Sequence, residues 1–91
     1  MTKRVTLRVI GLVQGVGYRL MSQKEAQRRQ LSGKVRNRDN GSVEIIAEGD
    51  EAELKGFIQW CYTGVGPAQV HKIEEEWAEA TGGFVDFVIE S

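Results

Sequence analysis

The sequence predicts an α+β fold, in which two helices pack on one face of a sheet and the elements follow the order β-α-β-β-α-β. Short segments that alternate apolar and polar residues, as half-buried strands do, are separated by two segments of helical character. A turn signal at residues 39–41 joins the two middle strands into a hairpin. Because 91 residues give room for one core, we expect a single domain over residues 1–91.

The first strand is predicted over residues 5–10, where the apolar side of the alternation is Val5, Leu7 and Val9. It is expected to stop at Gly11, and a glycine-dense stretch follows. Residues 20–30 are mostly good helix formers. The apolar stripe of this helix is thin: it rests on Met21 and Ala26, with Tyr18 and Leu20 as further candidates.

Ser32-Gly33 is expected to end this helix. Strands predicted over residues 34–38 and 42–48 flank Asp39-Asn40-Gly41, since Asn and Gly tolerate the positive φ of a tight hairpin. In the second strand of the hairpin, one face is expected to be buried and the other to face away. The buried set is Val43, Ile45 and Ala47, and the opposite set is Glu44, Ile46 and Glu48.

Asp50 is a candidate N-cap for the second helix, with Glu53 three residues later as in a capping box. Apolar residues follow at helical spacing: Leu54, Phe57, Ile58 and Cys61. Residues 69–77 predict a strand whose broken alternation suggests a bulge, and residues 84–90 predict a short last strand. Two split β-α-β units in this order form a ferredoxin-like sandwich, with an antiparallel sheet, both helices on one face and a short extra C-terminal strand.

The composition and net charge exclude several classes of function. The hydrophobic fraction of 41% and charged fraction of 27% are those of a soluble globular protein, and the net charge of -1 argues against nucleic-acid or anionic-membrane partners. The single cysteine, Cys61, excludes an intramolecular disulfide, a cysteine-based zinc cluster and a CxxC redox pair. With no signal-peptide core after the basic start and no membrane-length apolar run, we expect a cytoplasmic location.

The glycine-dense stretch is a candidate anion site. A strand that ends in such a loop and leads into a helix presents several backbone N–H groups to one point, at the positive end of the helix dipole. Gly15 and Gly17 let the backbone curl, and Arg19 adds a guanidinium that binds two phosphate oxygens at once. On spacing alone, a tight turn with a surface arginine remains the more common interpretation. A Walker loop and a dinucleotide fingerprint are excluded, because the Lys-Ser/Thr ending and the third glycine are missing.

Two separated motifs resemble the signatures of the acylphosphatase family. The first is Gly11-Leu12-Val13-Gln14-Gly15-Val16-Gly17-Tyr18-Arg19, and the second runs from Gly33 through Asn37 to Val43, with Gly49 beyond it. Further similarity lies at Ala26, Ala47-Glu48-Gly49, Phe57, Trp60, Gly66-Pro67, Ala68 and Val70. The resemblance therefore covers nearly the whole chain. Two positions depart from the pattern: Tyr18 stands where the family usually has phenylalanine, and Lys34 where an aromatic usually follows the glycine.

The resemblance implies hydrolysis of the carboxyl-phosphate anhydride bond of a small-molecule acyl phosphate by in-line attack of water, without a metal or cofactor. It implies that Arg19 holds the phosphate and Asn37 positions the water. The implied phosphate-binding loop is Gln14, Gly15, Val16, Gly17, Tyr18 and Arg19. This chemistry asks little of the protein, because a carboxylate leaving group, whose conjugate acid has a pKa of about 4, departs without being protonated. We expect a monomer, with no nucleic-acid or membrane partner.

Two other functions are compatible with a phosphate loop or with this fold. A phosphate- or metabolite-sensing domain would keep the loop without turnover. An RNA-recognition module shares the fold but needs aromatic residues on a central strand, and residues 42–49 contain none. His71 is expected to be structural or at the surface, and Cys61 to be a small buried hydrophobe. Arg36 and Arg38 are expected to point together, away from Asn37.

Overall fold

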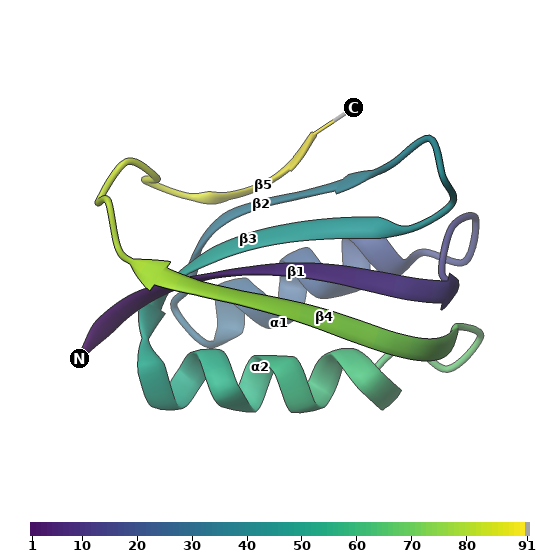
Figure 1. Cartoon of the computed structure of the whole chain (residues 1–91), viewed down its shortest axis with the longest axis horizontal. Helices are drawn as coiled ribbons and strands as arrows, with labels where there is room; N and C mark the ends of the chain where they lie inside the picture. The colour runs from purple at the N-terminus through teal and green to yellow at the C-terminus, as the bar shows by residue number, and fades with distance from the viewer. Residues whose placement is uncertain (91) are drawn as a thin grey trace.

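The computed structural model describes residues 1–90 and shows a five-stranded sheet with two helices on one face (Figure 1). The elements are β1 (Thr2–Leu12), α1 (Tyr18–Arg28), β2 (Ser32–Asn37), β3 (Val43–Asp50), α2 (Glu51–Thr63), β4 (Gln69–Glu79) and β5 (Phe87–Glu90). The strand order is β4-β1-β3-β2-β5. The predicted order of elements and the ferredoxin-like arrangement are confirmed.

The sheet is mixed: the four strands of the ferredoxin-like unit are antiparallel, as predicted, and the short extra C-terminal strand, whose direction was not predicted, is parallel to its neighbour. β4, β1, β3 and β2 pair antiparallel, but β5 pairs parallel with β2. The chain leaves β4 at one edge of the sheet and returns as β5 along the opposite edge (Figure 1). Sequence alternation reports which side chains of a strand are buried, and it carries no information on this direction.

The core lies between the sheet and the helices, where the predicted buried faces are confirmed. Side chains of β1 and β3 that are fully shielded from solvent are Val5, Leu7, Val9, Val43, Ile45 and Ala47. From α2, the buried residues are Leu54, Phe57, Ile58 and Cys61. Phe57 stacks on Trp60 and meets Phe87 of β5 edge-on, at centroid distances of 6.0 and 6.2 Å. Burial of each Val, Leu, Ile or Phe side chain in this core contributes about 1.5–3 kcal/mol to the free energy of folding.

Helix α1 differs from its prediction. It begins at Tyr18, two residues earlier than expected, and its buried residues are Tyr18, Ser22 and Ala26 at i, i+4 and i+8. Tyr18 and Ala26 are buried as predicted, whereas Leu20 and Met21 are 48% and 41% exposed, so their assignment to the buried stripe was wrong. Serine occupies the middle of the buried face, so a search for apolar residues finds only the two ends of that face.

Local signals at the strand and helix boundaries are largely confirmed. Asp50 caps α2, its carboxylate accepting from the N–H of Ala52 at 3.2 Å, while the Glu53 carboxylate pairs with Arg29 at 3.1 Å. β1 does not stop at Gly11 but continues to Leu12. The predicted bulge is present in β4: Ile10 pairs with Lys72 and Gly11 with Val70, which leaves His71 as the extra residue. No helix within residues 1–90 has both the length and the apolar character that crossing a membrane requires.

Glu48 faces away from the helices, as expected, yet it is only 3% exposed because the segment after β4 covers it. Its carboxylate accepts from Arg4 at 2.7 Å, from the N–H and hydroxyl of Thr81 at 2.9 Å each, and from the N–H of Gly82 at 3.0 Å. Burial alone would raise the pKa of Glu48, but these hydrogen bonds outweigh it and lower the pKa to about 2. This carboxylate ties the β4–β5 connection to the open face of the sheet.

We expect Glu48→Gln to lower the free energy of unfolding at pH 7 by roughly 2–4 kcal/mol, because Arg4 loses its buried partner and an amide N–H group faces other donors. The folded pKa lies below the ordinary value of 4.5, so the stabilisation is fully present above about pH 4.5 and is lost as the pH falls towards 2. Urea unfolding between pH 2 and 7 should show the difference from wild type shrinking over that range. Glu76→Gln, which removes an exposed partner of Arg8, is the control. A difference that does not change with pH would contradict the account.

Candidate functional site

A pocket of about 210 Å³ opens where the loop after β1, the first turn of α1, the end of β2 and β5 meet. Its lining residues are Val13, Gly15, Gly17, Tyr18, Arg19, Leu20, Asn37 and Ile89. Segments far apart in the sequence thus supply one concave site, and they include the two residues expected to carry the chemistry.

The loop after β1 is shaped by two glycines. Gly15 and Gly17 have φ of 76° and 81°, the left-handed region that disfavours other residues. A Cβ at either position would meet no heavy atom of the described chain within 4 Å, so the requirement is one of backbone conformation. Gly17 is the N-cap of α1, and no acidic side chain lies in the first turn of this helix. The N–H groups of that turn are therefore suited to binding an anion.

Four of the six residues of the predicted phosphate loop line the pocket: Gly15, Gly17, Tyr18 and Arg19. The other two side chains are directed elsewhere. The Gln14 amide donates to the carbonyls of Arg38 and Ser42 at 2.8 and 2.9 Å, which fastens the loop to the β2–β3 hairpin. Val16 packs against the hydrophobic core. Both residues hold the loop in place while their backbone remains part of it.

Arg19 and Asn37 bring complementary groups to the pocket. Within residues 1–90, no acidic side chain forms an ion pair with the half-buried Arg19. Asn37 is the last residue of β2, and its side-chain oxygen is buried without a hydrogen-bond donor from the described part of the chain. The expected direction of Arg36 is consistent with its contact, because it pairs with Glu44 at 2.9 Å. A guanidinium without an acidic partner thus lines the same pocket as a residue whose side-chain oxygen has no hydrogen-bond donor among residues 1–90.

Tyr18 anchors the start of α1 beneath the pocket. It is 1% exposed, and its hydroxyl donates to the carbonyl of Cys61 in α2 at 2.6 Å. Burial raises its pKa well above the ordinary value, so the phenol is neutral at physiological pH. The departure from phenylalanine is therefore accommodated by one interhelical hydrogen bond. Burial likewise raises the pKa of Cys61 to about 12, which leaves an unreactive thiol, as expected of a small buried hydrophobe.

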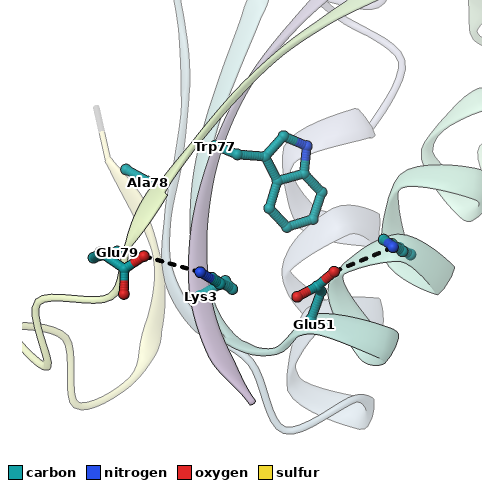
Figure 2. A pocket seen from close by; sticks show the side chains of 6 residues that line it. Lys3, Glu51, Trp77, Ala78 and Glu79 are labelled. Atoms are coloured by element: carbon teal, nitrogen blue, oxygen red, sulfur yellow. Dashed lines mark hydrogen bonds and ion pairs between the residues drawn. The ribbon is translucent and has the colours of Figure 1, made fainter.

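A larger pocket, of about 460 Å³, lies between β1, the end of β4 and the start of α2 (Figure 2). Trp77 forms part of its wall. Its two lysines already have carboxylate partners: Lys3 pairs with Glu79 at 2.9 Å, and Lys55 with Glu51 at 3.2 Å. Since these cations are neutralised, an anionic substrate is better served by the pocket that contains Arg19.

His71 is exposed at the bulge of β4, which is the surface position expected for it. Among residues 1–90, no three His, Cys, Asp or Glu side chains gather as a metal ion would require.

Three residues of the pocket were not among the predicted site residues. Val13 belongs to the first motif, but it precedes the predicted phosphate loop. Leu20 was assigned to the buried stripe of α1, but it lines the pocket and is exposed. Its position directly after Arg19 in the sequence was the one signal that it lies at the site. Ile89 lines the pocket because β5 pairs parallel with β2, which places Ile89 opposite Val35. No local pattern predicts that pairing.

Known proteins resemble this chain over nearly its whole length. The sequence model of the acylphosphatase family matches residues 5–89. An acylphosphatase from Paenarthrobacter aurescens is 40% identical over 97% of this chain and 94% of its own, and one from Caldanaerobacter subterraneus subsp. tengcongensis is 43% identical over 98% and 99%. The crystal structure of acylphosphatase from Bacillus subtilis superposes with a TM-score of 0.94 at 38% identity, covering 98% of this chain and 99% of that one. The chain therefore belongs to the acylphosphatase family.

Proposed function

We propose that this protein hydrolyses acyl phosphates, breaking the carboxyl-phosphate anhydride bond to give a carboxylate and inorganic phosphate. Relatives at 40 and 43% identity that bear the name acylphosphatase support this function. The observation that carries it is the meeting of an anion-binding loop, Arg19 and Asn37 in one pocket. We assign phosphate binding to the loop and Arg19, and the placing of water to Asn37.

Phosphate binding follows from the donors of the pocket. The N–H groups of the first turn of α1 lie at the positive end of the helix dipole, directly after the glycine loop. The guanidinium of Arg19 adds a planar pair of donors that binds two phosphate oxygens. Together these donors hold the phosphoryl group and stabilise the charge that develops on its oxygens during transfer.

The hydrolytic step needs a water molecule in line with the bond that breaks. The buried oxygen of Asn37 lacks a donor among the described residues, and such an acceptor costs about 1–3 kcal/mol when left unsatisfied. When the side chain turns this oxygen towards the pocket, an O–H group of the attacking water satisfies it. The water oxygen bonds to phosphorus, the bond to the acyl oxygen breaks, and the carboxylate leaves. Both protons of the water are retained by the phosphate product, one on the attacking oxygen and the other on a phosphate oxygen. No general acid is required, because the leaving carboxylate needs no proton. No metal is required, because Arg19 and the N–H groups of the loop stabilise the charge on the phosphoryl oxygens.

The proposed enzyme is a cytoplasmic monomer that acts on a small molecule and binds no nucleic acid. The free thiol of Cys61 suits a reducing compartment. An RNA-recognition role is not favoured, because β1 and β3 carry no aromatic residue on which bases would stack. The open face of the sheet carries ion pairs of both signs, such as Arg8 with Glu76 and Arg36 with Glu44.

We expect the purified protein to hydrolyse benzoyl phosphate at an undiminished rate in excess EDTA, because no step of the proposed reaction uses a metal. Inorganic phosphate should inhibit competitively by occupying the loop. Initial rates at several substrate and phosphate concentrations, with and without chelator, test both statements. Loss of turnover in EDTA with recovery on adding a divalent cation would contradict the mechanism. Purely non-competitive inhibition would place the anion site elsewhere, and phosphate binding without turnover would favour a sensing domain.

A further inference from the structure

The part of the pocket that phosphate and water do not use is aliphatic. Arg19 is the charged residue among the described residues of the lining, and the exposed apolar ones are Leu20 and Ile89. Leu20 is 48% exposed and Ile89 38%. We call these two side chains the aliphatic rim. They are partly exposed to solvent and line the same pocket as Arg19, which is proposed to bind the phosphate.

Isolated exposed aliphatic residues are normal on protein surfaces, so exposure alone carries no argument. The residues next to the rim in the sequence are exposed to a similar extent, so they can be compared with the rim residues. Met21 follows Leu20 in α1 and is 41% exposed, and Val88 precedes Ile89 in β5 and is 47% exposed. Both lie outside the lining of the pocket that residues 1–90 form. Of these four similarly exposed residues, the rim is the pair that shares a concave surface with Arg19 and Asn37.

The rim is held by regular structure. Ile89 pairs with Val35 of β2, two residues before Asn37. The β5 strand is fastened to α1 by Gln23 and Gln27, whose amides donate to the carbonyl of Phe87 at 3.0 and 3.3 Å. Leu20 is in the first turn of the same helix. Packing and hydrogen bonds therefore fix both rim residues relative to the phosphate loop.

An acyl phosphate bound by its phosphoryl group carries its acyl group only one bridging oxygen away. In a pocket of about 210 Å³, the remaining lining is within reach of that group. We propose, on the basis of the function proposed above, that Leu20 and Ile89 bind the apolar part of the acyl group and make the enzyme selective for aromatic and longer aliphatic acyl phosphates over acetyl phosphate. The selectivity arises because a larger apolar acyl group removes more of its own surface and of the rim from water.

The test compares kcat/KM for benzoyl phosphate with kcat/KM for acetyl phosphate. Leu20→Gln keeps the size and helix propensity of the side chain, and Ile89→Thr keeps its β-branching, so both variants should fold. We expect the double variant to lower the benzoyl-to-acetyl ratio by about 5–10-fold, the lower part of the range for apolar discrimination because the rim is partly exposed. Hydrolysis of acetyl phosphate and inhibition by inorganic phosphate should stay within about two-fold of wild type.

Met21→Gln combined with Val88→Thr is the matched control, since it makes the same chemical changes at the neighbouring exposed positions. It should leave the ratio unchanged. An unchanged ratio in the rim variant, an equal loss for both substrates, or an equal change in the control would overturn the inference while leaving the proposed function intact. Failure of the wild type to hydrolyse either substrate would instead refute the proposed function.

Discussion

Arg19→Ala is expected to lower kcat/KM for benzoyl phosphate by at least about 10²-fold, which corresponds to roughly 3 kcal/mol of transition-state stabilisation. The guanidinium has no acidic partner within residues 1–90 and lines the pocket together with the loop N–H groups, so its charge is available to the phosphoryl oxygens. The affinity for inorganic phosphate should fall as well, because the same contact serves ground state and transition state. Arg19→Lys should recover little, since an ammonium group cannot reproduce the planar pair of donors.

Lys24→Ala is the matched control for charge. It removes one positive charge from an exposed position of the same helix and leaves the pocket lining intact. Steady-state kinetics of both variants, with circular dichroism to confirm folding, separate a local contact from a general electrostatic effect. A folded Arg19→Ala variant with near-native kcat/KM would refute the assignment, and comparable losses in both variants would show that net charge is responsible.

The fold was predictable where local chemistry and tertiary structure agree. The alternation of Val5, Leu7 and Val9, the turn before β3 and the Asp50 cap all act within a few residues, and they appear as expected. Features set by distant contacts were not predictable. The parallel direction of β5 depends on pairing with β2, and the burial of Glu48 depends on Thr81 and Gly82, which lie 33 and 34 residues further along the chain.

The candidate site likewise has residues that the sequence predicted and residues that only the fold brings to it. Arg19 and Asn37 were expected from the two motifs, and the structure places both in one pocket. The role of Gln14 differs from its place in the motif, because its amide fastens the loop to the hairpin carbonyls of Arg38 and Ser42. Ile89 joins the pocket through strand pairing alone. Motifs thus indicated the polar groups of the site, whereas its apolar lining required the fold.

Asn37→Ala is expected to separate binding from chemistry. Asn37 is assigned to the water, so kcat should fall by at least about 10²-fold while the affinity for inorganic phosphate, measured by calorimetry, stays within a few-fold of wild type. Asn37→Asp should be poor in both respects, because it brings a negative charge close to the incoming phosphate. Asn40→Ala is the control for damage to the hairpin, since the Asn40 side chain accepts from the N–H of Ser42 at 3.1 Å and lies in the turn.

The free energy of unfolding of the Asn37→Ala variant is a second measurement that distinguishes the two roles of Asn37. A structural role predicts that this free energy decreases. The buried oxygen of Asn37 receives no hydrogen bond from residues 1–90, so its removal should leave the free energy of unfolding unchanged or slightly higher. Loss of turnover without loss of stability is the pattern of a group retained for function at a cost to the fold. A marked decrease in stability, or comparable losses in kcat and phosphate affinity, would show that Asn37 shapes the anion site. An unchanged kcat would remove Asn37 from the mechanism.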